Sequence, residues 1–330
     1  MAGYVGRLAP SPTGALHLGN VRTFMVAWLR ARQAGGRLIL RMEDLDHPKH
    51  KPGADVQAIE DLRWLGFDWD EEYVQSQRKH LYAAALDTLV SKGLAYPCVC
   101  SRSDIEAVQS APHEGEQLRY PGTCRNRFAS WADACAAMDA SLQRTANYQL
   151  PTTNSLRIPC WRFRTPQDSH VSFDDVFAGR YEMDVWEKLG DFPLARDERG
   201  GGYAIAVTVD DAAMGVTEVV RGDDLLPATP PQILLYRALN PQPSTLNPQP
   251  AFFHVPLVVG PDRRRLAKRH GDTRIASFRE AGVSPERLIG FLARSLGLIE
   301  NERPIRLRSL IGLLVPARIP RGPLVYQGLT

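Results

Sequence analysis

A loop of small and polar residues near the start of the chain could hold a phosphate group. It covers residues 9–20 and contains His17, Gly19 and Asn20, followed by apolar residues at helical spacing. A buried strand is predicted before it, at 4–9. The N-terminus of a helix has unpaired N–H groups and a partial positive charge, which favour polyphosphates. An ordinary connecting loop with a surface histidine is the alternative that this stretch alone leaves open.

A second candidate is the basic run at residues 263–271, which follows a predicted strand and a Gly-Pro-Asp turn. A lysine in such a loop, here Lys268, can neutralise the charge that develops on a departing phosphate group. Taken alone, a run of this kind is more often a solvated surface or a nonspecific phosphate patch.

Three of the five cysteines have spacings typical of metal ligands: Cys98, Cys100 and Cys124. Three thiolates and a fourth donor would complete a tetrahedral structural zinc site, which could stabilise a segment too irregular to bury a large core. Buried free thiols are the alternative, because a Cys-x-Cys pair alone is a weak signal. The remaining two have no such pattern, and we expect them in the core: Cys135 and Cys160.

The composition narrows the class of protein. The chain has 330 residues, of which 44% are hydrophobic, and 40 basic against 37 acidic side chains give a net charge of +3. This charge permits nucleic-acid binding without requiring it. The sequence has neither an apolar run long enough to span a membrane nor a signal-peptide core, so we expect a cytoplasmic protein. Five cysteines are too few for a disulfide scaffold.

Alternating strand and helix patterns must position these residues. Strands are predicted at 4–9, 38–42, 203–209, 216–220 and 252–259. Helices are predicted at 21–29, 56–65, 81–89, 229–239 and 284–297. Gly66 and Gly93 should end two of these helices, and Thr229 and Ser284 should begin two others. The predicted fold is α/β, with a Rossmann-like doubly wound parallel sheet, an irregular zinc-stapled insertion and a short helical C-terminal part.

We expect four parts along the chain. Residues 1–95 form the first half of a nucleotide-binding catalytic domain, and 96–194 form the insertion with the candidate zinc site. Residues 195–275 form the second half with the basic run, and 276–330 form a helical C-terminal segment and tail. A Pro-rich seven-residue duplication at 239–251 is expected to be a surface insert, and no function is assigned to it.

Residues 7–20 resemble the HIGH signature of class I aminoacyl-tRNA synthetases in its glutamate-specific form. The likeness continues through 35–46 and through Arg-Leu-Ala-Lys-Arg at 265–269, which resembles the KMSKS loop. This sequence differs in having Asn20 for the final histidine of the first motif, and Arg265 and Ala267 for a lysine and a serine of the second. The resemblance implies three catalytic residues that also bind ATP: His17, Asn20 and Lys268. It implies that two more bind ATP: Gly19 and Leu266.

The same resemblance implies a pocket for L-glutamate. Arg7 and Arg221 would hold the γ-carboxylate, since arginine pairs bidentately with carboxylates. Glu43 would face the α-amino group. The pocket would be lined by three further residues: Ala9, Ser11 and Tyr203. The alternative is that the two arginines form ordinary salt bridges at strand ends.

The resemblance also implies the zinc ligands, because related enzymes have Cys-x-Cys followed by Tyr-x-x-x-Cys. Both spacings occur here, so the implied ligands are Cys98, Cys100, Tyr120 and Cys124. His113 is a possible substitute for Tyr120. We expect Mg²⁺ to bind together with ATP, but the sequence does not indicate which residues would be its ligands.

The likeness covers about residues 4–300, which leaves no room for the anticodon-binding domain of a full-length glutamyl enzyme. Short paralogues without that domain activate glutamate in the absence of tRNA and attach it to the queuosine base of tRNA(Asp), and their ending resembles residues 318–325. We therefore expect this ATP-dependent ligase activity, in a monomer without membrane partners. A truncated enzyme that charges tRNA(Glu) and a non-catalytic nucleotide- or tRNA-binding module are the alternatives.

Overall fold

The computed structural model describes residues 3–45, 51–108, 118–144, 158–198, 201–240, 249–264, 266 and 272–329. Lys268 and His113 lie outside this part of the chain, as do most of the basic run and most of the duplication at 239–251. Their predicted roles therefore stay predictions.

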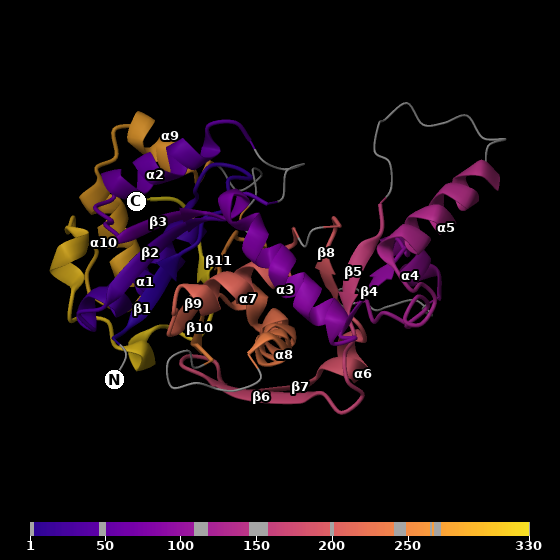
Figure 1. Ribbon diagram of the computed structural model, residues 1–330. Helices are drawn as coiled ribbons and strands as arrows, with labels where there is room; N and C mark the ends of the chain where they lie inside the picture. The colour runs from indigo at the N-terminus through magenta and orange to yellow at the C-terminus, as the bar shows by residue number, and fades with distance from the viewer. Residues whose placement is uncertain are drawn as a thin grey trace.

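A parallel three-stranded sheet contains the N-terminal strands (Figure 1). Its order is β1 (Val5–Leu8), β2 (Arg37–Met42) and β3 (Glu71–Val74). The helical elements that connect and follow these strands are α1 (Leu18–Gln33), α2 (Ala54–Trp64), η2 (Gln75–Arg78) and α3 (Lys79–Ser91). Gly66 and Gly93 follow two of the helices with left-handed φ angles of 88° and 68°, which confirms the predicted helix ends.

A second sheet has the order β7-β6-β10-β9. Three of its strands are parallel: β9 (Glu218–Gly222), β10 (Ala251–Val255) and β6 (His170–Asp175). Strand β6 also forms an antiparallel hairpin with β7 (Gly179–Asp184). The two sheets meet where β1 lies beside β9, since the backbone N of Thr217 donates to the carbonyl of Val5 at 2.9 Å. Parallel strands alternating with helices confirm the predicted α/β class.

A third, antiparallel sheet lies apart from the first, beyond α3 in Figure 1. It consists of β4 (Ala95–Cys98), β5 (Cys160–Phe163) and β8 (Pro193–Ala195). Three helices belong to this part of the chain: α4 (Arg102–Val108), α5 (Trp131–Arg144) and α6 (Val185–Leu189). A small cluster that includes Tyr96, Ile105 and Tyr120 packs on one side of it, whereas Trp161 and Phe163 of β5 belong to a larger core.

The C-terminal residues pack back on the first sheet. The elements are α9 (Ile275–Glu280), α10 (Pro285–Ser295), η5 (Leu307–Leu310), η6 (Pro316–Arg318) and β12 (Leu324–Val325). Strand β12 pairs in parallel with β11 (Val258–Val259). Ser284 caps α10 by accepting from the backbone N of Arg287, as predicted. The largest hydrophobic core joins α1 and β2 to these C-terminal residues.

The prediction of a strand at 203–209 is wrong. This segment is the start of helix α7 (Tyr203–Ala213), which packs against α3 and α8 (Thr229–Leu239). A short apolar run suits a buried strand and a buried helix equally, and only the continuation through Asp211 and Ala213 reveals the helix. Burial of residues on several sides of α7 removed the periodicity that would otherwise have distinguished it.

Two predicted boundaries were also wrong. The N-cap of α8 is Ala228, which is also the last residue of η3 (Asp223–Ala228), and Thr229 is the first residue of the helix. The hydroxyl of Thr229 accepts from Arg221 at 2.7 Å, so a tertiary contact takes the place of a cap. The strand predicted at 252–259 is divided into β10 and β11, in different sheets, because Pro256 between them has no N–H for a ladder.

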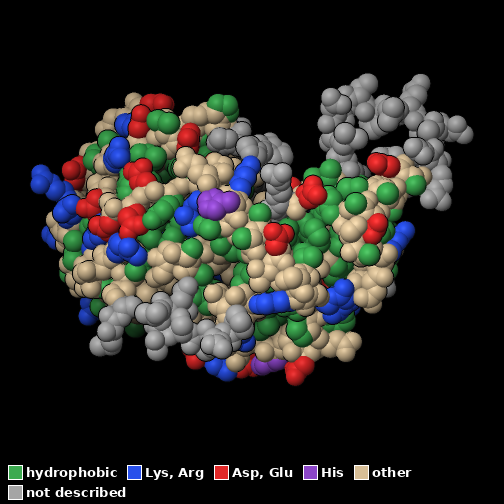
Figure 2. All heavy atoms as spheres, in the orientation of Figure 1, with side chains coloured by type: hydrophobic (Ala, Val, Ile, Leu, Met, Phe, Trp, Pro, Cys, Tyr) green, Lys and Arg blue, Asp and Glu red, His purple; other side chains and the backbone are tan. Residues whose placement is uncertain are grey.

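Acidic and basic side chains are interspersed on the face shown in Figure 2, over the part that contains β1 to β3 and α1. No patch of a single sign dominates this face, in keeping with the small net charge. Among the described residues, no helix is both long and apolar enough to cross a membrane.

Candidate functional site

The motif at the start of α1 caps its own helix. His17 Nδ1 accepts from the backbone N of Gly19 at 3.1 Å, and Asn20 Oδ1 accepts from the backbone N of His17 at 3.2 Å. This reciprocal arrangement is a capping box. A Cβ added at Gly19 would lie 3.1 Å from two atoms of the His17 ring, so a larger residue would require the ring to shift by a few tenths of an ångström.

The same end of α1 has fewer unpaired N–H groups than we predicted. The backbone N of Leu18 donates to the carbonyl of Thr273 at 3.1 Å, and those of Gly19 and Asn20 are directed to the His17 side chain. The His17 side chain satisfies two of these donors within the motif, and the segment at Thr273 satisfies the third. The helix dipole and the side chains of the motif are what remain to attract a phosphate chain.

The residues that follow the basic run lie directly against this motif. The backbone N of Ile275 donates to the carbonyl of Leu16 at 2.9 Å, and His17 forms a β-bridge with Arg274. Leu266 packs against the main core. The chain therefore leaves the basic run beside His17, although the two segments are far apart in the sequence.

Glu43 belongs to a buried ionic network that the sequence did not reveal. Arg41, which is 0% exposed, lies 2.9 Å from Glu43 Oε1 and 2.6 Å from Asp211 Oδ1. Burial raises the pKa of Glu43, against the opposing effect of Arg41. The backbone N of Glu43 donates to the carbonyl of Pro10 at 2.9 Å, which joins the network to the loop with Ala9 and Ser11.

Arg7 and Arg221 approach the same network from β1 and β9. Arg7 Nη1 donates to the carbonyl of Val220 at 2.8 Å, and Arg7 Nε lies 3.6 Å from Asp211 Oδ1 without a hydrogen-bond partner among the described residues. Burial lowers the pKa of Arg221. Tyr203, 47% exposed at the start of α7, interacts with both Glu43 and Arg221.

Among the described residues, Arg221 forms no direct ion pair with a carboxylate, and Asp175 lies behind it across His254. The members of the network are three arginines and two carboxylates: Arg7, Arg41, Arg221, Glu43 and Asp211. The neighbouring Asp210 is neutralised separately by Arg78 at 2.7 Å. A buried guanidinium without a directly paired carboxylate favours a ligand with an anionic group.

Sequence reasoning also missed the groups that hold Arg221. Its guanidinium donates to His254 Nε2 at 3.0 Å, to Gln232 Oε1 at 2.8 Å and to Thr229 Oγ1 at 2.7 Å. Asp175 lies behind His254, with 2.6 Å between Oδ2 and Nδ1. The Thr-Pro-Pro-Gln segment at 229–232 was a signal in the sequence, but we interpreted it only as a helix start.

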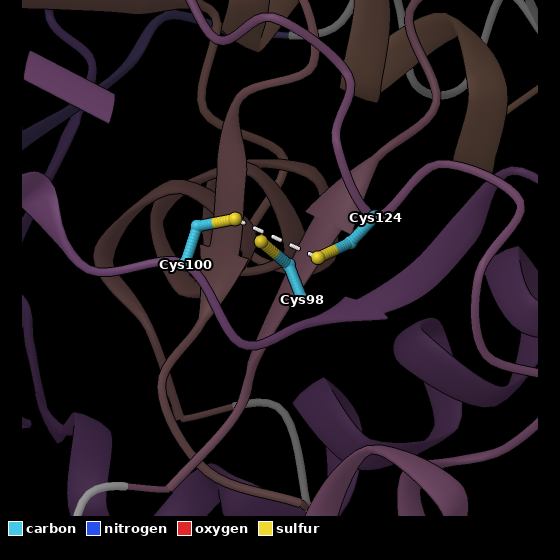
Figure 3. A group of neighbouring side chains, drawn as sticks. All are labelled: Cys98, Cys100 and Cys124. Atoms are coloured by element: carbon cyan, nitrogen blue, oxygen red, sulfur yellow. Dashed lines mark hydrogen bonds between the residues drawn. The ribbon is translucent and has the colours of Figure 1, made fainter. Parts of the chain in front are cut away.

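The three thiols predicted to bind a metal do lie together, as Figure 3 shows. Their sulfur atoms are all within 4.8 Å of one another, and those of Cys100 and Cys124 are 3.6 Å apart. The Tyr120 hydroxyl is 3.2 Å from Cys98 Sγ and 3.7 Å from Cys100 Sγ. Tetrahedral zinc with bonds of about 2.3 Å to sulfur would separate two sulfurs by roughly 3.8 Å, so this spacing fits a metal ion.

Arg162 on β5 adjoins the thiol cluster. Its Nε donates to Cys98 Sγ at 3.2 Å, and its guanidinium carbon lies 3.8 Å from the centre of the Tyr120 ring. Cys160, which we expected in the core, is only partly buried and pairs with Cys98 across β4 and β5. Cys135 on α5 is also partly buried.

The comparisons with known proteins agree with this architecture. Residues 5–307 match the family described as tRNA synthetases class I (E and Q), catalytic domain, and the chain belongs to this family. It is 46% identical to the glutamyl-Q tRNA(Asp) synthetase of Symbiobacterium thermophilum, over 96% of this chain and 94% of the relative. It is 43% identical to the glutamyl-Q tRNA(Asp) synthetase of Nitratidesulfovibrio vulgaris, over 97% and 94%.

More distant relatives are longer. The glutamate–tRNA ligase of Aquifex aeolicus is 38% identical over 87% of this chain, which spans 56% of that enzyme. Among solved structures, the glutamate tRNA ligase from Elizabethkingia meningosepticum in complex with its amino acid superposes with a TM-score of 0.77 and 25% identity, over 99% of this chain and 67% of that one. This likeness confirms the fold predicted from the sequence.

Proposed function

We propose that this protein activates L-glutamate with ATP in the absence of tRNA and transfers it to the queuosine base of tRNA(Asp). The observation that supports the activation step is the buried network of Arg7, Arg41, Glu43 and Asp211, beside an Arg221 without a direct carboxylate partner among the described residues. The second step is supported by the names of the relatives that this chain matches over 94% of their length. A cytoplasmic location follows from the tRNA substrate.

In the first step, an α-carboxylate oxygen of glutamate attacks the α-phosphorus of ATP. The bond to the β-phosphate oxygen breaks, and pyrophosphate leaves with its Mg²⁺. The γ-carboxylate would pair with Arg7 and Arg221, and the α-ammonium group would face Glu43. His17 and Asn20 would hold the end of α1 toward the phosphates, while Lys268 would neutralise the pyrophosphate.

In the second step, a hydroxyl of the queuosine diol attacks the carbonyl carbon of glutamyl-adenylate. An ester forms, AMP departs with the bonding electrons, and the hydroxyl proton is lost to solvent. The positioning of both substrates is the main contribution that the protein can make to this transfer.

We further propose that the thiol cluster holds a structural zinc ion through Cys98, Cys100, Cys124 and the Tyr120 hydroxyl. The spacing of these four donors supports it. When bound, zinc would cross-link β4 to the turn at 121–127, a region with only a small core of its own.

Pyrophosphate exchange tests the first step. We expect exchange that depends on glutamate, requires no tRNA and is weak with glutamine or aspartate. No exchange under these conditions would leave the non-catalytic binding module as the better interpretation.

Mapping of labelled glutamate tests the second step. We expect the label on queuosine-containing tRNA(Asp), with loss of acceptance after periodate oxidation of the queuosine diol. Label on a 3′-terminal adenosine of tRNA(Glu) would instead support the tRNA(Glu)-charging alternative, for which the 38% identity to glutamate–tRNA ligases is the favouring observation.

A further inference from the structure

A buried chain of hydrogen bonds runs behind Arg221 and takes no direct part in the proposed reaction. Arg221 Nε donates to His254 Nε2 at 3.0 Å, and His254 Nδ1 lies 2.6 Å from Asp175 Oδ2. The side chains of His254 and Asp175 are both 0% exposed. The three residues belong to β9, β10 and β6, which are neighbouring strands, so the chain of bonds crosses the second sheet.

The contacts of Asp175 determine which nitrogen of His254 carries the proton. Asp175 Oδ1 accepts from the backbone N of Phe177 at 2.9 Å and of Ala178 at 2.8 Å. Burial alone would raise the pKa of Asp175, but these bonds and the one to His254 outweigh it and lower the pKa. An ionised carboxylate can only accept, so Nδ1 of His254 is the donor and Nε2 is left as an acceptor for Arg221.

Two further acceptors complete the cage around the guanidinium. Gln232 Oε1 and Thr229 Oγ1 accept from Nη1 and Nη2 at 2.8 Å and 2.7 Å. Arginine has five N–H donors in one plane, so at most two remain for Tyr203 and a ligand. The plane of the guanidinium is therefore fixed before any substrate binds.

We infer that His254 and Asp175 are positioning residues that determine the preference for an acidic amino acid by holding Arg221 in a pre-organised orientation. The inference rests on the proposed function, since it assigns the γ-carboxylate of glutamate to Arg221. A mobile arginine side chain would lose rotamer freedom when the carboxylate binds, and this loss would weaken the binding. An arginine that is already held in place avoids this entropic cost. Neither residue would touch the substrate, since both side chains are 0% exposed.

Three substitutions separate this role from simple structural support. His254→Leu removes the acceptor, and His254→Gln keeps one. Asp175→Asn retains the shape of the side chain. If the amide oxygen of the asparagine continues to accept from the backbone N–H groups of Phe177 and Ala178, its NH₂ group must face His254. The imidazole would then carry its proton on Nε2, opposite the N–H of Arg221. His170→Gln is the control, because this histidine is 55% exposed at its side chain on the same strand as Asp175.

The readout is glutamate-dependent pyrophosphate exchange of the full chain. His254→Leu and Asp175→Asn should raise the KM for glutamate roughly 10- to 100-fold and reduce the preference over glutamine to a similar degree. The KM for ATP should stay near that of the wild type, and His254→Gln should recover most of the loss. Unchanged KM values, with activity reduced only in proportion to the folded fraction, would overturn the inference.

A measurement on the wild type keeps the test valid if a variant does not fold. Nitrogen-15 NMR should show His254 as a neutral ring protonated on Nδ1, the less common tautomer. A ring protonated on Nε2, or on both nitrogens at neutral pH, would overturn the inference. Wild-type protein without any glutamate-dependent exchange would instead reject the proposed function itself, and this inference with it.

Discussion

The guanidinium of Arg162 covers the ring of Tyr120 at 3.8 Å and donates from Nε to the sulfur of Cys98 at 3.2 Å. With the proposed zinc bound, three thiolates around a divalent ion would leave one negative charge, which a buried arginine in this position would offset. Residues that hydrogen-bond to metal ligands typically change metal affinity 10- to 100-fold.

Arg162→Met should therefore weaken zinc binding by roughly tenfold or more. The measurement is competition with a chelator, followed by metal analysis of the protein. Arg102→Met is the control, because that side chain is 83% exposed nearby and its ion pair, with Glu106, lies on the surface. Equal affinities in the two variants would contradict this role of Arg162.

Tyr120→Phe tests the fourth ligand. The hydroxyl lies within 3.7 Å of two thiols, and it accepts from the backbone N of Cys124 at 2.8 Å. Phenylalanine keeps the ring under Arg162 and removes only the oxygen. We expect zinc affinity to fall roughly tenfold or more. An unchanged zinc affinity would mean that another donor, such as His113, is the fourth ligand.

Asp211→Asn should strongly destabilise the fold. Asp211 pairs with Arg41 at 2.6 Å and lies 3.6 Å from Arg7, and both arginines are buried. Loss of one partner of a buried ion pair costs about 3–5 kcal/mol of the free energy of unfolding, because the remaining charge stays buried. Urea unfolding measures this loss.

Glu72→Gln is the matched control for Asp211→Asn. It breaks a pair with Arg63 at 3.5 Å in which both side chains are well exposed. Such pairs contribute about 0–1 kcal/mol. Similar losses in the two variants would show that burial of the Asp211 network is not what makes it stabilising.

Gly19→Ala should separate activity from stability. The new Cβ would lie 3.1 Å from the His17 ring, which must then move. Alanine favours helices over glycine by about 1 kcal/mol, so the free energy of unfolding should change little. We expect the kcat of pyrophosphate exchange to fall roughly 10- to 100-fold, since small displacements of positioning groups are costly. Gly3→Ala is the control because it lies outside the motif and its Cβ would meet nothing within 4 Å, and an equal effect there would refute the role of the ring.

Local features of this fold could be predicted from sequence because they depend on neighbouring residues. Gly66, Gly93 and Ser284 mark helix ends through their own backbone or side-chain chemistry, and the Cys98 and Cys124 motifs bring metal-type donors together. The first strands and α1 follow from apolar spacing alone.

The groups that hold the site depend on contacts between distant residues. Arg41 meets Asp211 across 170 positions, and His254 meets Asp175 across 79. A single sequence contains no signal for such pairs. The helix α7 was missed for a related reason, since burial on several faces removes its periodicity.

The buried His254–Asp175 pair predicts how stability depends on pH. Burial lowers the pKa of His254 below its ordinary value of 6.5. Between the folded pKa and 6.5, the unfolded chain binds more protons at this histidine than the folded chain does. Stability should therefore decrease as the pH falls below 6.5. The lowered pKa of Asp175 acts in the same direction at more acidic pH, where its contribution is lost as the pH falls through the folded value.

His254→Gln removes the titrating group, so its free energy of unfolding should fall less steeply than that of the wild type between pH 7.5 and pH 5.5. Urea unfolding at several pH values measures both curves, with His170→Gln as the exposed control expected to follow the wild type. Parallel curves for His254→Gln and the wild type would mean that His254 titrates alike in both states. That result would be incompatible with a neutral imidazole held between Asp175 and Arg221, because such a ring must resist protonation as long as the fold persists.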